Sequence, residues 1–220
     1  MMPRELPLFP LNVVLFPGAR LPLHIFEPRY RQLLVDCGAE DDCFGLCLPG
    51  GGVGGAPAAG TIGTVAEILF RQVLPDGRSN IIIEGRERFV VTGLVEDGTP
   101  YAMATVDAIT DFDTQVPGAD AAELQDRFAE YRQLLARFID EEIDDAPLSD
   151  DVETLSFQAS ASIDCDLEDK LQLLVAQSTA ARVTRLLELL DELIPALTEA
   201  VRLREGARSN GLDRLEPPSN

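Results

Sequence analysis

Four cysteines and one histidine are the residues of this 220-residue chain that could most readily bind a metal. Structural zinc sites favour close Cys-x-x-Cys pairs that are completed by a second pair or by histidines. The spacings here do not follow that pattern, and His24 is the only imidazole; the cysteines are Cys37, Cys43, Cys47 and Cys165. We therefore expect no metal site and no cofactor. In a reducing compartment these cysteines should be mainly small buried apolar residues.

The familiar catalytic constellations are also missing. A Ser-His-Asp triad would require His24, but its place near Pro22 in a strand-like run favours a packed or barrel-surface imidazole. Lys170 is the sole lysine, and its neighbour Asp169 and its capping context favour an exposed helix start over the desolvated base of a Ser-Lys dyad. The sequence therefore predicts that the chain is not an enzyme.

Two glycine-rich or acidic patterns favour loops over ligand sites. Gly50, Gly52 and Gly55 satisfy G-x-G-x-x-G, but residues 56–60 lead to another strand and not to a helix that could hold a pyrophosphate. No G-x-x-x-x-G-K-[ST] sequence is present. The acidic run within 140–151 lacks the central glycine and ligand order of a calcium loop. A solvated connection between helices is favoured, with loose cation association as the alternative.

Charge and hydropathy limit the classes of partner. The formal net charge of −20 repels phosphate backbones and anionic lipid surfaces. No run approaches the roughly 18 to 20 apolar residues of a membrane span, and the first ten residues lack the apolar core of a signal peptide. We therefore expect no nucleic acid, no membrane and a cytoplasmic location.

The first half of the chain is typical of a small β-barrel. Runs rich in Val, Ile, Thr and aromatic residues predict strands at 21–26, 43–48, 61–74, 80–84, 89–95 and 101–109. Cys43 and Cys47 should face the same side of their strand. Turns at 75–77 and 97–98 contain glycine for a positive φ and predict antiparallel hairpins. These short strands favour a closed or nearly closed barrel that hides its edges.

Helical signals begin within the barrel half and dominate the second half. Glu27 followed by Pro28 predicts an inserted helix, which Gly38 can close in a left-handed conformation. After residue 111, the sequence predicts a helix that is capped at Asp120 and runs to about 143. A second helix is predicted to start near Ser149. A further helix is predicted to start at Asp166, which forms a capping pattern with Asp169.

The longest predicted helix begins at Ser178 or Thr179. Proline at position 195 is predicted to kink it. Its apolar stripe is Leu186, Leu190, Leu193, Leu197 and Val201. Together the patterns predict a barrel lobe at 1–112, a helical lobe at 113–205 and a flexible tail at 206–220.

The segment 6–30, LPLFPLNVVLFPGARLPLHIFEPRY, resembles the opening of the amino-terminal domain of the ATP-dependent Lon proteases. The residues that carry the resemblance are the run LPLFPL, the Phe16-Pro17-Gly18 turn and Glu27-Pro28-Arg29-Tyr30. The run EGRERF at 84–89 is similar to a second family signature. The resemblance covers roughly 6–204 and implies an α+β fold, with a PUA-like β-barrel lobe carrying one inserted helix and followed by an α-helical bundle lobe. No ATPase or peptidase domain is found in the sequence, so we expect a stand-alone version of the domain.

The resemblance implies a non-enzymatic module that binds unfolded polypeptide segments or a protein partner, with a separate protease or ATPase as one candidate. Cations and aromatics at strand ends suit peptide edges and carboxylates. This criterion selects a candidate surface of Phe26, Arg29, Tyr30, Arg86 and Arg88. The alternative is that Arg29 and Arg88 merely pair with Glu27, Glu84 or Glu87, in which case alanine at either position would change stability only slightly.

Two other functions stay open. One is a small-molecule pocket, with or without enzymatic activity, inside the barrel. The other is a self-associating adaptor that uses the stripe of the final helix, although such a stripe more commonly packs within its own lobe. The sequence leaves the oligomeric state and the ligand undetermined.

Overall fold

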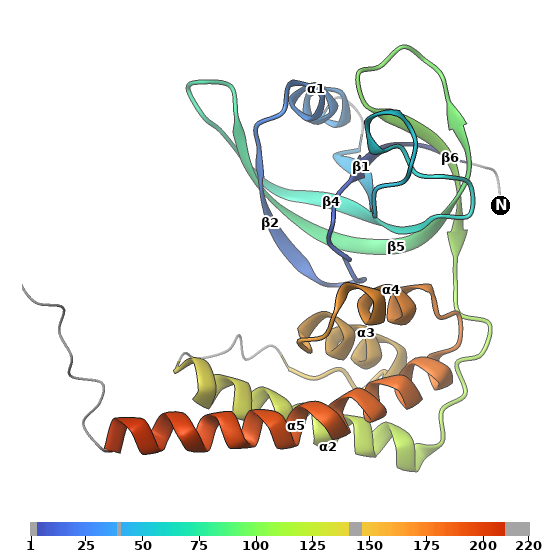
Figure 1. Ribbon diagram of the computed structural model, residues 1–220. Helices are drawn as coiled ribbons and strands as arrows, with labels where there is room; N and C mark the ends of the chain where they lie inside the picture. Colours follow the sequence, from blue (N-terminus) through green and yellow to red (C-terminus); the bar gives the residue numbers. More distant parts are fainter. Residues whose placement is uncertain (1–3, 39–40, 141–146, 210–220) are drawn as a thin grey trace, which may run out of the picture.

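A computed structural model describes residues 4–38, 41–140 and 147–209 of the chain (Figure 1). A β-rich lobe forms one layer, and a group of helices lies against one end of it. The predicted order of a barrel lobe followed by a helical lobe is confirmed. The predicted tail at 210–220 and part of the acidic run, 141–146, fall outside the described residues.

Six strands form one sheet that closes on itself. Their order is β2-β5-β4-β3-β1-β6, and β5 also pairs with β6. The pairings are antiparallel except for β1 with β3, which is parallel. Five strands thus make a ring, and β2 is added outside it along β5. The strands are β1 (Arg4–Pro10), β2 (Arg20–Ile25), β3 (Cys43–Cys47), β4 (Ile62–Val73), β5 (Ser79–Val95) and β6 (Ala102–Ile109).

The strands at 80–84 and 89–95, which were predicted as separate, are one continuous strand, β5. The charged run between them does not interrupt the pairing, because Gly85 lies opposite Ala66 and the ladder to β4 continues on both sides. Both glycine turns are confirmed as antiparallel hairpins, with φ of 81° at Gly77 and 83° at Gly98.

Helix α1 (Pro28–Cys37) is the inserted helix, with Glu27 at its N-cap and Pro28 in its first turn as predicted. The left-handed ending at Gly38 was wrong, since this residue keeps a right-handed φ of −68° and donates its N–H to the Leu34 carbonyl. The chain reverses instead at Asp42, where φ is 53°.

The loop between β3 and β4 contains a short 3-10 turn, η1 (Val53–Gly55), and leads directly into β4. The glycine motif is therefore a hairpin loop, as predicted. Cys43 and Cys47, at the two ends of β3, pack in the same apolar cluster inside the barrel. That cluster consists of Leu6, Leu8, Cys47, Val65, Phe89, Val91, Ala104 and Val106, with Cys43 and Ala102 packed against it.

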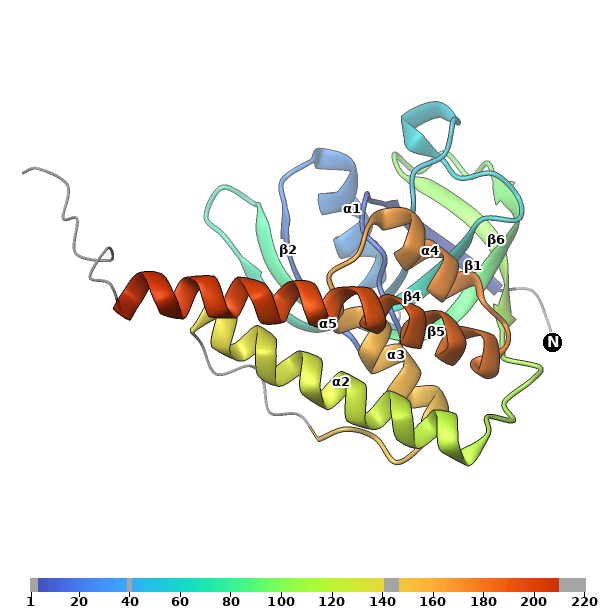
Figure 2. The same ribbon diagram turned by 60° about the horizontal axis from the view of Figure 1, so that its bottom comes forward.

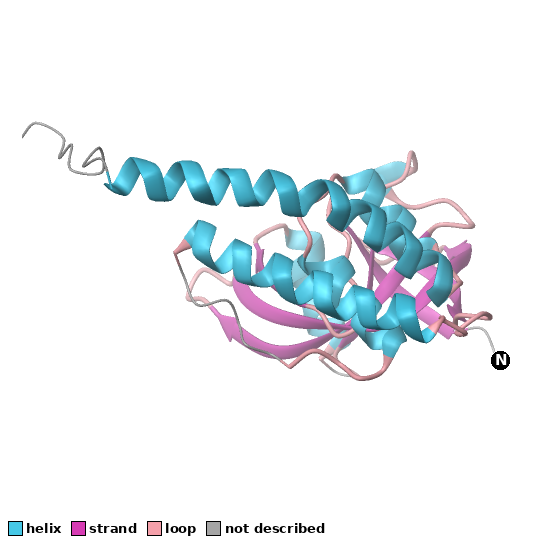
Figure 3. Cartoon of the chain, turned by 90° about the horizontal axis from the view of Figure 1, so that it is seen from below, coloured by secondary structure: helices cyan, strands magenta, loops and turns pink. Residues whose placement is uncertain are grey.

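The helical lobe contains α2 (Gly118–Ile139), α3 (Val152–Ser162), α4 (Leu167–Val175) and α5 (Thr179–Ser209). Figures 2 and 3 show α2 and α5 side by side, with α5 extending beyond the end of α2. Helix α5 continues through Pro195 and reaches four residues past 205, so 206–209 are helical and not part of a tail. The kink at Pro195 stays a prediction.

The predicted helix starts were right for two of the four helices. Asp166 caps α4 by accepting the Asp169 N–H at 2.8 Å, and Ser178 Oγ accepts the Ala181 N–H at 3.1 Å before α5. The cap at Asp120 was wrong, because α2 begins two residues earlier, at Gly118. Helix α3 begins after Ser149, with Asp151 as its cap.

Candidate functional site

Arg88, one of the predicted binding residues, lies in the buried junction between the two lobes. Its side chain donates to the carboxylate of Asp111 and to the carbonyls of Leu174 and Ala176, at 2.7 and 2.6 Å. Arg182 donates to the same carboxylate at 2.7 Å. Arg88 is only 3% exposed, so it offers no surface to a ligand. The alternative partners Glu84 and Glu87 were also wrong, because Asp111 takes that place.

Arg29, Tyr30 and Phe26 lie together at the corner between β2 and α1. Arg29 pairs with Glu27 at 3.0 Å, which confirms the ion-pair alternative for this residue, and its guanidinium lies over the ring of Tyr30. Tyr30 is buried against Phe9. Burial raises its pKa above the ordinary value. Phe26 is 61% exposed and stacks on the ring of His24.

Arg86 is exposed but lies away from that corner. It forms ion pairs with Glu67 and Glu84. Glu84 is in register with Arg20 at the start of β2, whereas Phe26 follows the end of β2. Because a strand rises about 3.3 Å per residue, the two ends of this strand are well separated. The five predicted residues therefore do not form one site.

A continuous exposed face instead runs across β2, β5 and the second half of β4. Residues in direct register point to the same side of an antiparallel sheet. Pro22, Ile82 and Phe70 are in register and form an apolar row. We call these three residues together with Phe26 the outer face.

A polar row borders the apolar one. His24, Asn80 and Gln72 are in register across the same three strands. His24 Nδ1 lies 2.7 Å from Asn80 Oδ1, and Asn80 Nδ2 donates to Gln72 Oε1 at 3.2 Å. His24 is therefore a surface imidazole at the barrel, as predicted.

The apolar row is open to solvent. Phe70 is 54% exposed and Ile82 is 39% exposed. A shallow cavity of about 350 Å³ lies here, lined by Pro22, Leu23, His24, Phe70, Asn80, Ile81 and Ile82. Sequence reasoning missed Phe70 and Ile82. The available signal was two short runs, 68–70 and 81–83, that are apolar at successive positions and therefore on both faces, which is unusual for a sheet with one solvated side.

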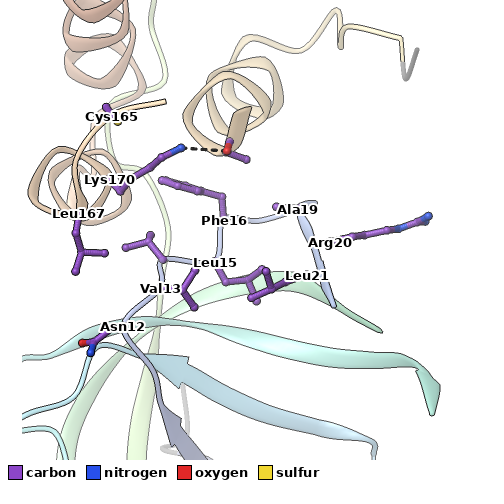
Figure 4. Close-up of a pocket in the computed structure, with 12 residues that line it drawn as sticks. Asn12, Val13, Leu15, Phe16, Ala19, Arg20, Leu21, Cys165, Leu167 and Lys170 are labelled. Carbon is purple, nitrogen blue, oxygen red and sulfur yellow. Dashed lines mark hydrogen bonds between the residues drawn. The ribbon is translucent and has the colours of Figure 1, made fainter. Parts of the chain in front are cut away.

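A second cavity, of about 410 Å³, lies where the turn before β2 meets α3 and α4 (Figure 4). Lys170 lines it and donates to the carbonyls of Ser160 and Ala161, at 2.5 and 3.0 Å. Its ammonium also lies over the ring of Phe16. The predicted exposed position of Lys170 was wrong, since burial lowers its pKa below the ordinary value. Its two carbonyl contacts show that it closes the end of α3.

None of the four cysteines, all of which lie in the described segments, forms a disulfide. Among residues 4–38, 41–140 and 147–209, no group of three or more His, Cys, Asp or Glu side chains could hold a metal ion. Burial raises the pKa of Cys47 to about 12 and also raises the pKa values of Cys43 and Cys165. Since the thiolate is the reactive form, the fold suppresses thiol chemistry at these positions.

This burial predicts a graded reaction with thiol reagents. At pH 8 in native buffer, we expect Cys47 to react at least about tenfold more slowly than Cys43, because its thiolate is scarcer and less accessible. Peptide mass spectrometry after timed alkylation measures both rates. Alkylation in denaturant is the control and should label both residues equally. Equal native rates would contradict the prediction.

None of the helices in the described segments combines the length and the hydropathy that a membrane span requires.

The fold is a two-lobed α+β domain with an exposed apolar face. The family described as the ATP-dependent protease La (LON) substrate-binding domain matches residues 5–192. The chain belongs to this family, and the predicted resemblance is confirmed.

Curated relatives are longer proteins. A Lon protease of Cytophaga hutchinsonii is 30% identical over 203 residues, covering 89% of this chain and 25% of its own. Lon protease 2 of Myxococcus xanthus is 28% identical over 202 residues, covering 86% of this chain and 24% of its own. The chain thus spans about a quarter of the length of these relatives.

Solved structures confirm the predicted fold class. A Lon N-terminal domain protein from Xanthomonas campestris is 28% identical, with a TM-score of 0.63, over 84% of this chain and 98% of that chain. The N-terminal domain of a Mycobacterium avium complex Lon protease is 16% identical, also with a TM-score of 0.63, over 86% and 98%. The second similarity concerns the fold alone.

Proposed function

We propose that this chain is a non-catalytic polypeptide-binding module that takes exposed apolar segments on its outer face. The observation that carries the proposal is the open apolar row of Pro22, Ile82 and Phe70, extended by Phe26. Exposed apolar patches rimmed by polar groups are typical of interaction sites. Membership of a family described as substrate-binding supports the same conclusion.

The polar row beside the apolar one fits an extended segment. Side chains of a bound strand alternate, so one set can pack on Phe70 and Ile82 while backbone groups reach the Asn80 and Gln72 amides. Strand β2 is the free edge of the sheet, but Pro22 removes a donor from it. Face packing is therefore favoured over addition of a strand at this edge.

The proposal includes a cytoplasmic location and a separate protease or ATPase as a candidate partner. The lack of disulfides among the four cysteines is compatible with a reducing compartment. Of the residues selected from sequence, Phe26 belongs to the proposed surface, while Arg29 and Arg86 would act only at its margins.

The two alternative functions receive less support. The barrel interior is filled by the apolar cluster described above, which leaves less room for a small-molecule pocket there. In the stripe of α5, Leu186, Leu190 and Val201 are buried, and Leu193 and Leu197 pack against the core of the helical lobe. That stripe is therefore used within the chain, which disfavours the self-associating adaptor.

The test is binding of a permanently unfolded, dye-labelled polypeptide, measured by fluorescence anisotropy at two salt concentrations. We expect saturable binding that changes little with salt, because apolar contacts are not screened. Changing Phe70 and Phe26 together to serine should weaken binding by about tenfold or more, since each removes an exposed aromatic worth more than about 1 kcal/mol at an interface.

Phe112→Ser is the matched control, because Phe112 is an exposed phenylalanine that is not part of the outer face. It should bind like the unmodified protein. A folded version of the labelled polypeptide should not bind. Loss of binding in the Phe112 variant alone, or no binding of the unfolded chain at high protein concentration, would remove the basis of the proposal.

A further inference from the structure

Two arginines, Arg31 on α1 and Arg71 near the tip of the β4–β5 hairpin (the arm), have no carboxylate partner among the described residues. Most arginines in the described segments form ion pairs, such as Arg4 with Asp41 and Arg78 with Asp76. Arg31 and Arg71 form none with any described residue, although the chain carries 38 acidic residues. Both line one cavity of about 410 Å³ between α1 and the arm.

The fold holds the Arg71 guanidinium by a hydrogen bond and places that of Arg31 against the hairpin turn. Arg71 Nη1 donates to the Leu34 carbonyl at 2.8 Å, and its Nε is buried without a hydrogen-bond partner among the described residues. The Arg31 guanidinium lies over the turn at Gly77, where a Cβ would come within 2.1 Å of Nη2. Any side chain larger than hydrogen at that turn would displace Arg31.

The remaining walls of the cavity are neutral. They consist of Pro28, Gln32, Val35, Val73, Gly77 and Ser79, so no acidic residue of the described segments lines it. The nearest acids along the chain, Glu27 and Glu67, pair with Arg29 and Arg86. The next nearest also have other partners. Asp36 accepts from Gln32 and from the Tyr101 hydroxyl, and Asp76 accepts from Arg78. Asp42 lies near Arg71 without forming an ion pair with it, so neither guanidinium in the cavity is directly paired with a carboxylate of the described segments.

We propose that this cavity is a carboxylate-binding site that takes an acidic side chain of a peptide segment with apolar neighbours. Guanidinium groups bind carboxylates through paired hydrogen bonds, and two guanidinium groups that line one cavity without an ion pair favour an incoming acceptor. The exposed side chains of Val35 and Val73 form the apolar part of the rim.

A singly charged carboxylate is favoured over a phosphate group. The chain carries a net charge of −20, and the repulsion from that charge doubles for a dianion. The cavity and Phe70 lie on opposite faces of the β4–β5 arm. Arg71 directly follows Phe70 in β4, and successive side chains of a strand point to opposite faces of the sheet. The inference therefore goes beyond the proposed function and does not require it.

The test uses a short peptide of alternating Val and Glu that has both ends blocked and carries a neutral dye. The comparison peptide is identical except that Gln replaces Glu. Anisotropy at low salt should show binding of the Glu peptide and at least about tenfold weaker binding of the Gln peptide. Arg31→Gln and Arg71→Gln should each weaken binding of the Glu peptide by about tenfold or more.

Arg78→Gln is the matched control, since it removes the same charge from the neighbouring hairpin turn, at an arginine that is paired with Asp76. It should change binding less than about threefold, because a surface ion pair contributes little. Arg71→Lys should restore part of the binding lost in Arg71→Gln, provided that both variants show the melting temperature of the unmodified protein. Phe70→Ser should bind the Glu peptide normally, whatever happens to the unfolded polypeptide.

Three results would overturn the inference. One is equal binding of the Glu and Gln peptides, and another is no binding of the Glu peptide at all. The third is competition by inorganic phosphate but not by acetate at equal ionic strength, which would assign the site to phosphate groups instead.

Discussion

Replacing Asp111 with alanine is expected to lower the free energy of unfolding by about 3 to 5 kcal/mol. Its carboxylate lies between Arg88 and Arg182 in the junction of the lobes and also accepts from the Thr179 hydroxyl at 2.6 Å. All three charged side chains are almost completely buried. Without Asp111, two buried guanidinium groups would face each other with no negative charge between them.

The surrounding contacts explain why neighbouring groups do not compensate. Arg182 stacks on the ring of Phe157 at 3.9 Å, and Arg88 lies over the same ring at 5.1 Å. Neither guanidinium can turn to solvent without leaving this ring and the carbonyls at the end of α4. The loss would therefore separate the barrel from the helical lobe and not only weaken one contact.

Urea denaturation followed by circular dichroism measures this effect. Asp191→Ala is the control, because Asp191 pairs with Arg127 on the surface, and it should cost less than about 1 kcal/mol. Similar losses in the two variants would show that the buried junction contributes no more than a surface ion pair.

The same carboxylate makes stability depend on pH. Burial by itself would raise the pKa of Asp111, but hydrogen bonds from Arg182 and Thr179, with the charges of Arg182 and Arg88, hold it below the ordinary value. A depressed pKa in the folded state adds stability above the unfolded value of about 3.9 and loses it as the pH falls through the folded value. Denaturation between about pH 5 and 2 should show this loss, and Asp111→Asn should lack that component.

Gly85→Ala should cost about 3 kcal/mol or more, because the added methyl group would meet backbone and not a movable side chain. A Cβ at Gly85 would lie 2.2 Å from the Phe16 carbonyl oxygen. The Gly85 N–H donates to the Ala19 carbonyl, and the Gly18 N–H donates to the Gly85 carbonyl, at 2.9 and 2.8 Å. The turn at 16–18 must therefore either move or break these two bonds.

Displacement of this turn would reach both lobes. Phe16 belongs to the core cluster of the helical lobe, whereas the neighbouring Leu15 packs in the cluster beneath α1. Thermal and urea unfolding of Gly85→Ala should show a large loss of stability. Gly93→Ala on the same strand is the matched control, since nothing lies within 4 Å of its added Cβ. Equal effects would mean that loss of backbone freedom, and not close approach, determines the result.

The two sequence signatures of the family meet at this contact. The Phe16-Pro17-Gly18 turn and the run that contains Gly85 were identified separately from the sequence, and the backbone hydrogen bonds join them. Glycine is needed in the two signatures for different physical reasons. Gly18 has a φ of 75°, which favours glycine, whereas Gly85 is required by space.

Local patterns in the sequence were sufficient for the fold class, the hairpin turns at Gly77 and Gly98, the caps at Asp166 and Ser178, and the early helix after Glu27. Each of these depends on residues within a few positions of one another, so a local pattern is enough to predict it. The same patterns placed a barrel lobe before a helical lobe, and the family resemblance implied the same order and a PUA-like barrel. The predicted left-handed helix end at Gly38 and the predicted helix cap at Asp120 were wrong. Hydrogen bonds of the neighbouring turn decide where each of these helices ends or begins.

Only the tertiary structure decided which charged and aromatic residues are available for binding. Arg88 and Arg86 are two residues apart, yet one is buried against Asp111 and the other is on the surface. Arg31 and Arg71 meet in one cavity from elements far apart in the sequence. Phe70 and Ile82 become neighbours only through the register of β4 with β5. Burial and pairing across such distances depend on how whole elements pack, and no short pattern in the chain encodes that.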